Sequence, residues 1–502
     1  MRSAFTLLLV TLLLLPISAA VKSKSPKIPK PLAVKTHATV MIHGQKLAYT
    51  ATAGRLLLYD AKHKATASVF YIAYTLDGAD ASQRPITFAY NGGPGGASAL
   101  VDIGGFGPRR IAWPAPGSTA GELPPYQLVN NGDSIFNATD LVFIDAVGTG
   151  YSRIVGQGKP KMFYGIAADG QAFAQFIRRY VAQNGRWNSP KFLLGESYGT
   201  TRNAVVAEDL VRQGMYLNGV IMCSTVLDFP TVEFTPGNDM PYDFYLPSYA
   251  AVAWYHHRLH PQPASLPAWV KRAETFAAGS YAQALYQGSS LPAAQKQAIA
   301  TQLSQFTGIP AALWLKADLR MKLSLFMRRL LGPTGPMTGR YDGRFTTLEL
   351  QPILPFQGNT ASGATTSAIW GALSATFDQY VRQDLHYPSH RFYQQLNFAV
   401  NRQWKWQAGG DLRAENVAPA LARAMNNDPG MQVMFNNGYF DMATPFFATH
   451  YTITHMGLPP QLQSHIHVDF YDSGHMLYLN PQALAQVQRN MDAFIRAADG
   501  GR

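Results

Sequence analysis

The chain has 502 residues, of which 47% are hydrophobic and only 14% are charged, with a formal net charge of +12. This apolar content is enough for a large core and excludes a wholly disordered chain. The length predicts two to four domains, or one large domain with an insertion. The positive charge does not indicate nucleic-acid binding, because five lysines cluster between residues 22 and 35, and the sequence has neither zinc-finger spacing nor a basic stripe with interleaved aromatics.

The N-terminus has the pattern of a secretory signal peptide over residues 1–20. Arg2 precedes the apolar run "AFTLLLVTLLLLP", and Ser18-Ala19-Ala20 forms a small-residue cleavage site. We therefore expect a secreted or periplasmic protein without a membrane segment after cleavage. Residues 21–37, rich in Lys and Pro, are expected to be a flexible lead-in. A single cysteine, Cys223, excludes an intramolecular disulfide, fits a bacterial periplasm, and is expected to be buried.

The expected elements begin with antiparallel strands and continue with buried ones. Residues 38–75 alternate apolar and polar side chains, which indicates antiparallel strands. From residue 85 the apolar runs lose this alternation, as in central strands that are covered on both faces. A helical pattern at 162–183 separates two of them, so the sequence predicts an α/β fold with a mostly parallel sheet. The runs are "PITFAY", "LVFID", "KFLLG", "GVIMCS", "QVMFN" and "HVDFY".

The strand pattern is interrupted for about 200 residues, a gap much too long for a loop. We interpret residues 230–430 as an inserted, mainly helical cap domain, with helical runs at 292–306 and 311–331. Residues 38–229 and 431–502 would then be the two parts of the core. Aromatic runs at 243–257 and 391–406 are expected to form the walls of a substrate cleft above the site.

The stretch "KFLLGESYGT" places Ser197 between two glycines, after a buried strand and before a helix-compatible segment. This is the context of a nucleophile held on a sharp turn. A serine nucleophile needs a histidine base and an acid that orients the base, in the chain order Ser, acid, His for this type of fold. Asp441 and His475 each follow a strand and fit this order. Asp428, Asp469 and Asp472 are the alternative acids.

A nucleophilic serine also needs two backbone N–H donors that stabilise the oxyanion. One is expected at Tyr198, directly after the serine, and the other in the glycine-rich loop Asn91–Gly96. The loop contains a proline and lacks the GxGxxG and GK[ST] patterns, which argues against a nucleotide site. Neither a metal nor another cofactor is expected, because the histidines lack metal-ligand spacing and HExxH is absent.

The blocks "NGGPGGAS", "GESYG", "GYFDMATPF" and "SGHM" resemble those of the serine carboxypeptidase family of α/β-hydrolases. "DLVFIDAVGTGYSR" (140–153) resembles a further block, and "GRYDGRF" (339–345) is similar to the bacterial branch of the family. The resemblance implies Ser197 as nucleophile, Asp441 as acid and His475 as base. It implies oxyanion donors at Gly93 and Tyr198. It also implies that Asn91 and Glu196 bind the C-terminal carboxylate of a peptide substrate. Two carboxyl groups in contact must share a proton, so we expect activity to be favoured at acidic pH.

The sequence departs from this family at two positions of the site region. Gly96 stands where a half-cystine is usual, and Gly105 stands where the well-studied members carry another carboxylate. The leading hypothesis is a secreted serine carboxypeptidase acting on peptides with a free C-terminus. The alternatives are an esterase or acyltransferase with the same triad, or a non-catalytic binding protein of the same fold.

Overall fold

A computed structural model describes residues 27–113, 123–348, 363–406 and 415–500. Within these residues, ten strands form one sheet in the order β1-β2-β3-β7-β4-β9-β10-β13-β14, and β8 pairs with β3. The first three strands and β7 pair antiparallel, whereas every pair from β7 to β14 is parallel. This strand order, with crossover helices on both faces, is that of the α/β-hydrolase fold. The predicted fold class is confirmed.

The strands of the main sheet are β1 (Leu32–Ile42), β2 (Gln45–Tyr59), β3 (Ala65–Leu76), β4 (Ile86–Tyr90), β7 (Asp140–Ile144), β8 (Arg153–Ile154), β9 (Lys191–Glu196), β10 (Gly219–Cys223), β13 (Gln432–Gly438) and β14 (Ile466–Tyr471). Two small hairpins pair β5 (Arg109–Ile111) with β6 (Leu128–Asn130) and β11 (Met337–Thr338) with β12 (Thr346–Thr347). The helices of the core are α1 (Ala99–Val101), α2 (Ile166–Gln183), α3 (Tyr198–Arg212), α12 (Ala418–Asn427), α13 (Phe446–Thr454), α14 (Pro460–Gln463) and α15 (Pro481–Ala498).

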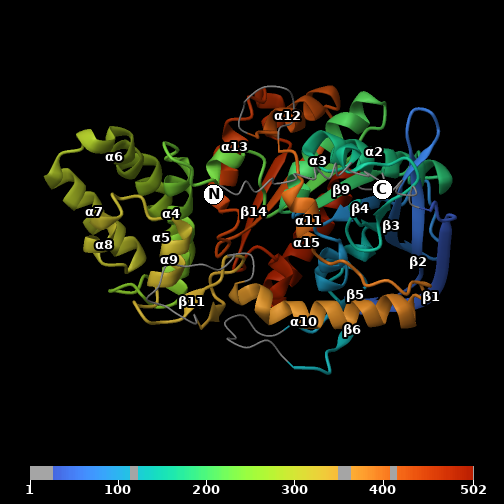
Figure 1. The fold of residues 1–502 in the computed structure, drawn as a ribbon, viewed down its shortest axis with the longest axis horizontal. Coiled ribbons are helices and arrows are strands. Elements are labelled where there is room, and N and C mark those ends of the chain that lie inside the picture. The colour runs from blue at the N-terminus through green and yellow to red at the C-terminus, as the bar shows by residue number, and fades with distance from the viewer. Residues whose placement is uncertain (1–26, 114–122, 349–362, 407–414, 501–502) are drawn as a thin grey trace, which may run out of the picture.

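Helices cover both faces of the sheet (Figure 1). On one face α2, α3 and α12 bury a cluster that includes Phe176, Leu210 and Leu421. On the other face α15 buries Leu484 and Met491 against the opposite side chains of the same strands. The central strands β4, β7, β9 and β10 are buried along their whole length, which explains why their sequences lack alternation.

The predicted boundary of the lead-in at residue 37 is wrong, because β1 already begins at Leu32. Residues 32–37 alternate between half-buried and exposed side chains and pair with residues 50–55 of β2. An edge strand tolerates such polar content because only one of its sides pairs with a neighbour. The predicted signal peptide, residues 1–20, lies outside the described residues. No helix of the described ranges is long and apolar enough to cross a membrane.

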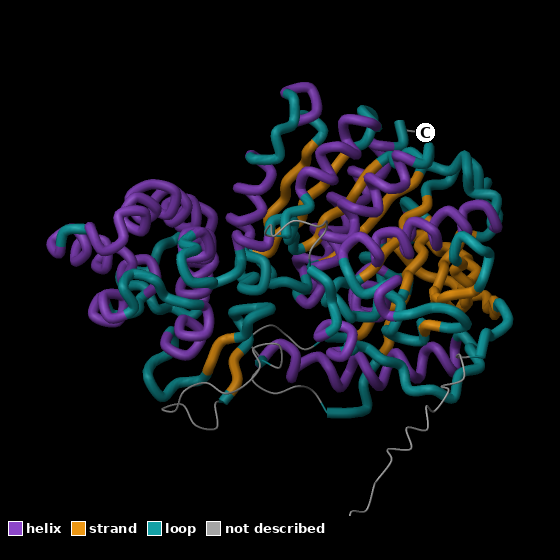
Figure 2. Tube along the Cα trace, turned by 45° about the horizontal axis from the view of Figure 1, so that its top comes forward, coloured by secondary structure: helices purple, strands orange, loops and turns teal. Residues whose placement is uncertain are grey.

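The expected insertion consists of two parts that differ in position. The helical lobe, residues 240–331, stands beside the main body and is made almost wholly of helices (Figures 1 and 2). The second part contains a long helix, α10 (Ala364–Gln379), which runs along the main body, and the short α11 (Phe398–Arg402). The helices of the lobe are α4 (Met240–Tyr255), α5 (Leu266–Phe276), α6 (Ala282–Gln287), α7 (Ala293–Thr307), α8 (Ala311–Lys316) and α9 (Leu323–Arg329).

Two predictions about the insertion need correction. The helical run at 311–331 is two helices, because Asp318 and Leu319 adopt positive φ angles between α8 and α9. The boundary at residue 430 is too late. Helix α12 packs its apolar side, including Leu421 and Met425, against the core cluster that contains α2 and α3. It therefore belongs to the hydrolase core.

Candidate active site

Ser197 lies on a sharp turn between β9 and α3. Its φ and ψ angles are 62° and −129°, a conformation that is unfavourable for a residue with a side chain. The turn is held by the N–H of Ser197, which donates to the carbonyl of Cys223 at 3.0 Å, and by the carbonyl of Ser197, which accepts from the N–H of Thr200 at 2.8 Å. The structure thus gives Ser197 the strained strand-to-helix position that the sequence pattern predicts.

Close backbone approaches explain the glycines around Ser197. A Cβ atom on Gly195 would lie 2.2 Å from the carbonyl oxygen of Gly199, so the turn closes only if residue 195 lacks a side chain. A Cβ atom on Gly92 would lie 2.4 Å from the backbone nitrogen of Tyr198. The glycine-rich loop therefore lies directly against the turn. Gly93 and Tyr198, the two predicted oxyanion donors, are consequently neighbours in space. The amide of Tyr198 begins α3, and such amides have no acceptor inside their own helix.

His475 and Asp441 form a buried hydrogen-bonded pair. Nδ1 of His475 lies 2.8 Å from Oδ2 of Asp441, and the two residues are 2% and 1% exposed. Oδ1 of Asp441 accepts from the N–H groups of Ala443 and Thr444, and Oδ2 accepts from the Thr444 hydroxyl at 2.7 Å. These donors fix the carboxylate, which in turn fixes the imidazole ring.

The structure separates Asp441 from the alternative acids. Asp428 accepts from the N–H of Leu217, far from His475, and Asp469 lies within β14. The carbonyl of Asp472 accepts from Arg344 and Asn480. Among the described carboxylates, only that of Asp441 lies within ion-pair distance of His475.

The loop that carries His475 is held from two sides. The N–H of His475 donates to the carbonyl of Tyr341 at 2.6 Å, and its carbonyl accepts from the hydroxyl of Ser224. Tyr341 belongs to the "GRYDGRF" block, whose Asp342 and Arg344 form a buried ion pair. This block therefore supports the histidine loop, a role that no local sequence pattern indicated.

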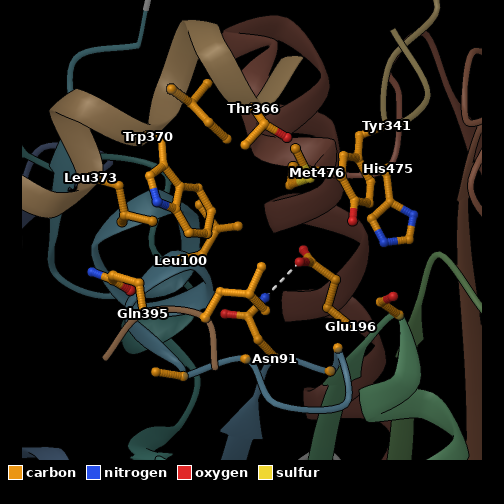
Figure 3. Close-up of a pocket in the computed structure, with 17 residues that line it drawn as sticks. Asn91, Leu100, Glu196, Tyr341, Thr366, Trp370, Leu373, Gln395, His475 and Met476 are labelled. Atoms are coloured by element: carbon orange, nitrogen blue, oxygen red, sulfur yellow. Dashed lines mark hydrogen bonds between the residues drawn. The ribbon is translucent and has the colours of Figure 1, made fainter. Parts of the chain in front are cut away.

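Glu196 and Asn91 meet beside Ser197, as the resemblance implied. Nδ2 of Asn91 donates to Oε1 of Glu196 at 2.6 Å, the bond drawn in Figure 3. The hydroxyl of Tyr478 donates to the same oxygen at 3.2 Å. The other oxygen, Oε2, is buried and has no hydrogen-bond partner among the described residues. Oε2 is therefore free to bond a ligand that enters the cavity.

Tyr478 was missed by the sequence analysis, and its position explains why residue 105 is a glycine. A Cβ atom on Gly105 would lie 2.4 Å from the ring of Tyr478, so the aromatic ring fills the space beside this glycine. The departure at Gly105 thus accommodates a tyrosine whose hydroxyl bonds Glu196. Tyr478 and Glu196 are 282 positions apart in the sequence, so local patterns could not reveal their contact.

The environment shifts the pKa values of two site residues upward. Burial, together with the charge of Asp441, raises the pKa of Glu196 to about 7. Burial opposes the charged form of His475, but the charge and hydrogen bond of Asp441 outweigh it, so the pKa of His475 is also raised. Glu196 is therefore a group that changes its protonation state near neutral pH.

A cavity of about 110 Å³ joins these residues. The view in Figure 3 shows Asn91 and Glu196 on its floor, Tyr341 and His475 on one side, and Leu100, Trp370 and Leu373 on the other. The far wall comes from α10, and Gln395 and Leu396 complete it. The aromatic run at 243–257, in contrast, is buried in the lobe core and contributes no residue to the cavity. The expectation that it forms a cleft wall is wrong.

A buried cation supports the floor of the site from below. Arg202 of α3 donates from Nε to Asp169 at 2.7 Å and from Nη1 to the carbonyl of Asn91 at 2.6 Å. Its guanidinium also lies over the rings of Phe173 and Tyr198. Arg202 thus ties the turn after Ser197 to the loop that carries Asn91. Arg202 lies in the helix-compatible segment after Ser197, but nothing in the sequence pattern marked it as a site residue.

Comparison with known proteins agrees with the motif-based resemblance. The model of the serine carboxypeptidase family matches residues 45–222. The resemblance to this family is confirmed. The matched part contains the glycine-rich loop and Ser197, and it ends before Asp441 and His475. No curated protein sequence gives a match to the chain.

Solved structures with overall similarity include three hydrolases. They are a proline iminopeptidase from Mycobacterium smegmatis (13% identity, 93% of this chain and 99% of that chain covered, TM-score 0.36), a putative aryl esterase from Burkholderia cenocepacia (12%, 88% and 98%, 0.34) and a soluble variant of monoglyceride lipase from Saccharomyces cerevisiae (9%, 96% and 99%, 0.33). At this level of similarity they give no indication of the substrate. The family match supports a serine hydrolase. Within the described ranges, no group of three or more His, Cys, Asp or Glu could hold a metal ion.

Proposed function

We propose that the protein is a serine carboxypeptidase that removes the C-terminal residue of peptides. The observation that carries the proposal is the buried, unpartnered Oε2 of Glu196, in the same cavity as Ser197 and His475. With Glu196 protonated, its O–H can donate to the terminal carboxylate of a peptide, and Asn91 can donate to the same group. The peptide bond before the last residue then lies beside the serine.

The reaction would follow the acyl-enzyme route. His475 takes the proton of the Ser197 hydroxyl while the oxygen attacks the scissile carbonyl, and Asp441 stabilises the imidazolium that forms. The N–H groups of Gly93 and Tyr198 stabilise the oxyanion. His475 then gives its proton to the departing amino group, and the free amino acid leaves. A water molecule, deprotonated by His475, hydrolyses the acyl-enzyme and restores Ser197.

The apolar wall of α10 supports a preference for apolar C-terminal residues. Trp370 and Leu373 lie on the side of the cavity opposite His475, where the side chain of the leaving residue would point (Figure 3). We further propose that the enzyme acts outside the cytoplasm after removal of residues 1–20. Mildly acidic conditions would favour it, because Glu196 is protonated below a pH of about 7.

The test compares matched substrates on the purified protein. A peptide ending in Leu as the free acid, its C-terminal amide and its C-terminal ester are incubated separately, and products are identified by mass spectrometry. A carboxypeptidase releases leucine from the free acid, and the amide is processed far more slowly. Turnover of the ester alone would instead favour an esterase or acyltransferase. Absence of turnover together with failure of a fluorophosphonate to label Ser197 would favour a non-catalytic binding protein.

A further inference from the structure

A second cavity, of about 290 Å³, lies away from Ser197, beside β2 and β3. It is enclosed by the loop after β7, by β8 and by residues 387–391, the beginning of a segment that we call the strap (residues 387–397). None of its lining residues is shared with the cavity at Ser197. The lining residues are Lys27, Pro29, Arg55, Ser68, Tyr151, Arg153, Val155, Tyr387, Pro388, Ser389, His390 and Arg391.

The lining contains four cationic side chains and no acidic one. Lys27, Arg55, Arg153 and Arg391 carry the charge, and no described carboxylate lies within ion-pair distance of any of them. Nη1 of Arg153 donates to the backbone carbonyls of residues 149, 150 and 152, which bring no neutralising charge. Burial and the positive charge of Arg391 lower the pKa of Arg153, and the charge of Asp145 opposes this shift. Cations that line one cavity repel one another, and a bound anion would relieve this repulsion.

Neutral donors line the same cavity. Tyr151 is only 7% exposed, and its hydroxyl group lies within reach of Ser389 and Arg382. Ser68 and Ser389 bring two further hydroxyl groups to the lining. A nearby arginine shows the contrast. Arg382 is neutralised by Asp378 at 2.9 Å and serves to hold the carbonyl groups of Ser389 and Arg391.

We propose that this cavity is a binding site for a phosphate group, either as the free ion or as part of a phosphate ester. Guanidinium groups match the oxygens of phosphate in geometry and charge, and four cations favour a doubly charged anion over a single carboxylate. The volume is close to the lower limit for small-ligand pockets and leaves room for more than the phosphate alone. The chain's own N-terminal residues cannot supply the anion, because residues 1–26 contain no Asp or Glu.

The strap links this site to the oxyanion loop. Its first residues line the phosphate site, whereas Gln395 and Leu396 line the cavity at Ser197. The carbonyl of Gln395 accepts from the N–H of Ala97 at 2.8 Å, and the N–H of Asn397 donates to the carbonyl of Gly95 at 2.8 Å. A ligand that holds one end of the strap therefore also restrains the part that braces the glycine-rich loop.

Binding is tested with inorganic phosphate on the full mature chain. Calorimetric titration should show one phosphate per chain, and 10 mM phosphate should raise Tm by about 1–3 °C over chloride at equal ionic strength. Hydrogen exchange should slow in the strap.

Two further ligands then show whether the phosphate group comes from a soluble ester or from a lipid. They are glycerol phosphate in solution and vesicles of phosphatidylcholine with 20% phosphatidic acid. Binding to the soluble ester alone indicates a metabolite, and co-sedimentation with the vesicles indicates a lipid headgroup.

Two variants locate the site. Arg391→Ala removes an exposed side chain without breaking a described ion pair, and should weaken phosphate binding at least tenfold. Tyr151→Phe removes only the hydroxyl group of a buried lining residue and should weaken phosphate binding severalfold. Lys161→Ala, an exposed lysine outside the cavity, is the matched control and should bind as the unaltered protein does. Equal phosphate affinity in all three variants, or a Tm rise no larger than with chloride, would overturn the proposal.

Discussion

The helical lobe and the segment from α10 to the end of the strap belong to the same long insertion but do different things. The lobe has a hydrophobic core of its own, in which Trp314, Tyr249 and Phe326 are almost completely buried. Helix α10 has no separate core. It packs Ile369 and Leu373 into the cluster of the main sheet and turns Trp370, half-buried, toward the cavity at Ser197.

Insertion into a fold does not by itself place a segment over the active site. Aromatic side chains are abundant in both parts, yet in the lobe they pair with one another, as Tyr249 and Phe326 do with ring centroids 3.9 Å apart. What gives α10 a role in the site is its packing on the main body. The lobe is therefore expected to affect stability, and α10 to affect substrate binding.

The largest effect is expected from a change outside both parts of the insertion, because neither part supplies a triad residue. Ser197→Ala should lower kcat/KM by roughly 10³- to 10⁶-fold while the fold persists, since the nucleophile is lost. The measurement is release of leucine from the free-acid peptide, with circular dichroism to verify folding. Ser290→Ala, an exposed serine of the lobe, is the control and should retain full activity. Near-native activity of the Ser197 variant would refute the assignment.

Two tryptophan variants test the comparison directly. Trp314→Ala should lower the free energy of unfolding by about 3–5 kcal/mol, because a fully buried ring is removed from the lobe core. Its KM and kcat should stay unchanged at temperatures where the variant is folded. Trp370→Ala should instead raise KM for a peptide ending in Leu by roughly 10- to 100-fold, because part of the apolar wall is lost.

Denaturant unfolding and steady-state kinetics on both variants check this pair. The two tryptophans serve as controls for each other, because the chemical change is the same and only the location differs. A large change in KM for Trp314→Ala, or unchanged kinetics for Trp370→Ala, would mean that the lobe and α10 do not divide the roles in this way.

The sequence alone was enough to predict the strands of the sheet and to name candidate site residues at the ends of these strands. Strands buried on both faces are continuous apolar runs, and Ser197, Asp441 and His475 each follow such a run. Contacts between distant segments could not be predicted. Tyr478 reaches Glu196, and Tyr341 holds His475, only because the chain folds these loops together. The boundary at residue 37 was misplaced because Lys and Pro residues obscured the alternating pattern of β1. The boundary at residue 430 was misplaced because the amphipathic α12 directly follows the insertion and resembles one more of its helices.

The smallest expected effect concerns the charge of Glu196. This residue belongs to the hydrolase core and lines the cavity at Ser197, of which α10 forms another wall. Because the pKa of Glu196 is raised to about 7, the residue is neutral and can donate a hydrogen bond below that pH, and is negatively charged above it. KM for free-acid peptides should therefore rise about tenfold for each pH unit above roughly 7, because only the protonated enzyme binds the carboxylate well. In contrast, kcat should fall at acidic pH. His475, whose pKa is raised, is then protonated and cannot take the proton of Ser197.

A stability measurement tests the same carboxyl group without substrate. An acid whose pKa is raised in the folded state binds more protons there than in the unfolded chain, so the free energy of unfolding falls as pH rises from about 4.5 to about 7. Glu196→Gln removes this loss and should unfold less readily than the parent at pH 8, by up to roughly 3 kcal/mol. The same variant should flatten the rise of KM with pH, since an amide donates at every pH. Tyr478→Phe, which removes one hydrogen bond to Glu196 but keeps the carboxyl group, should preserve the rise. Parallel KM curves for the free-acid peptide and its amide would show that Glu196 does not bind the chain end.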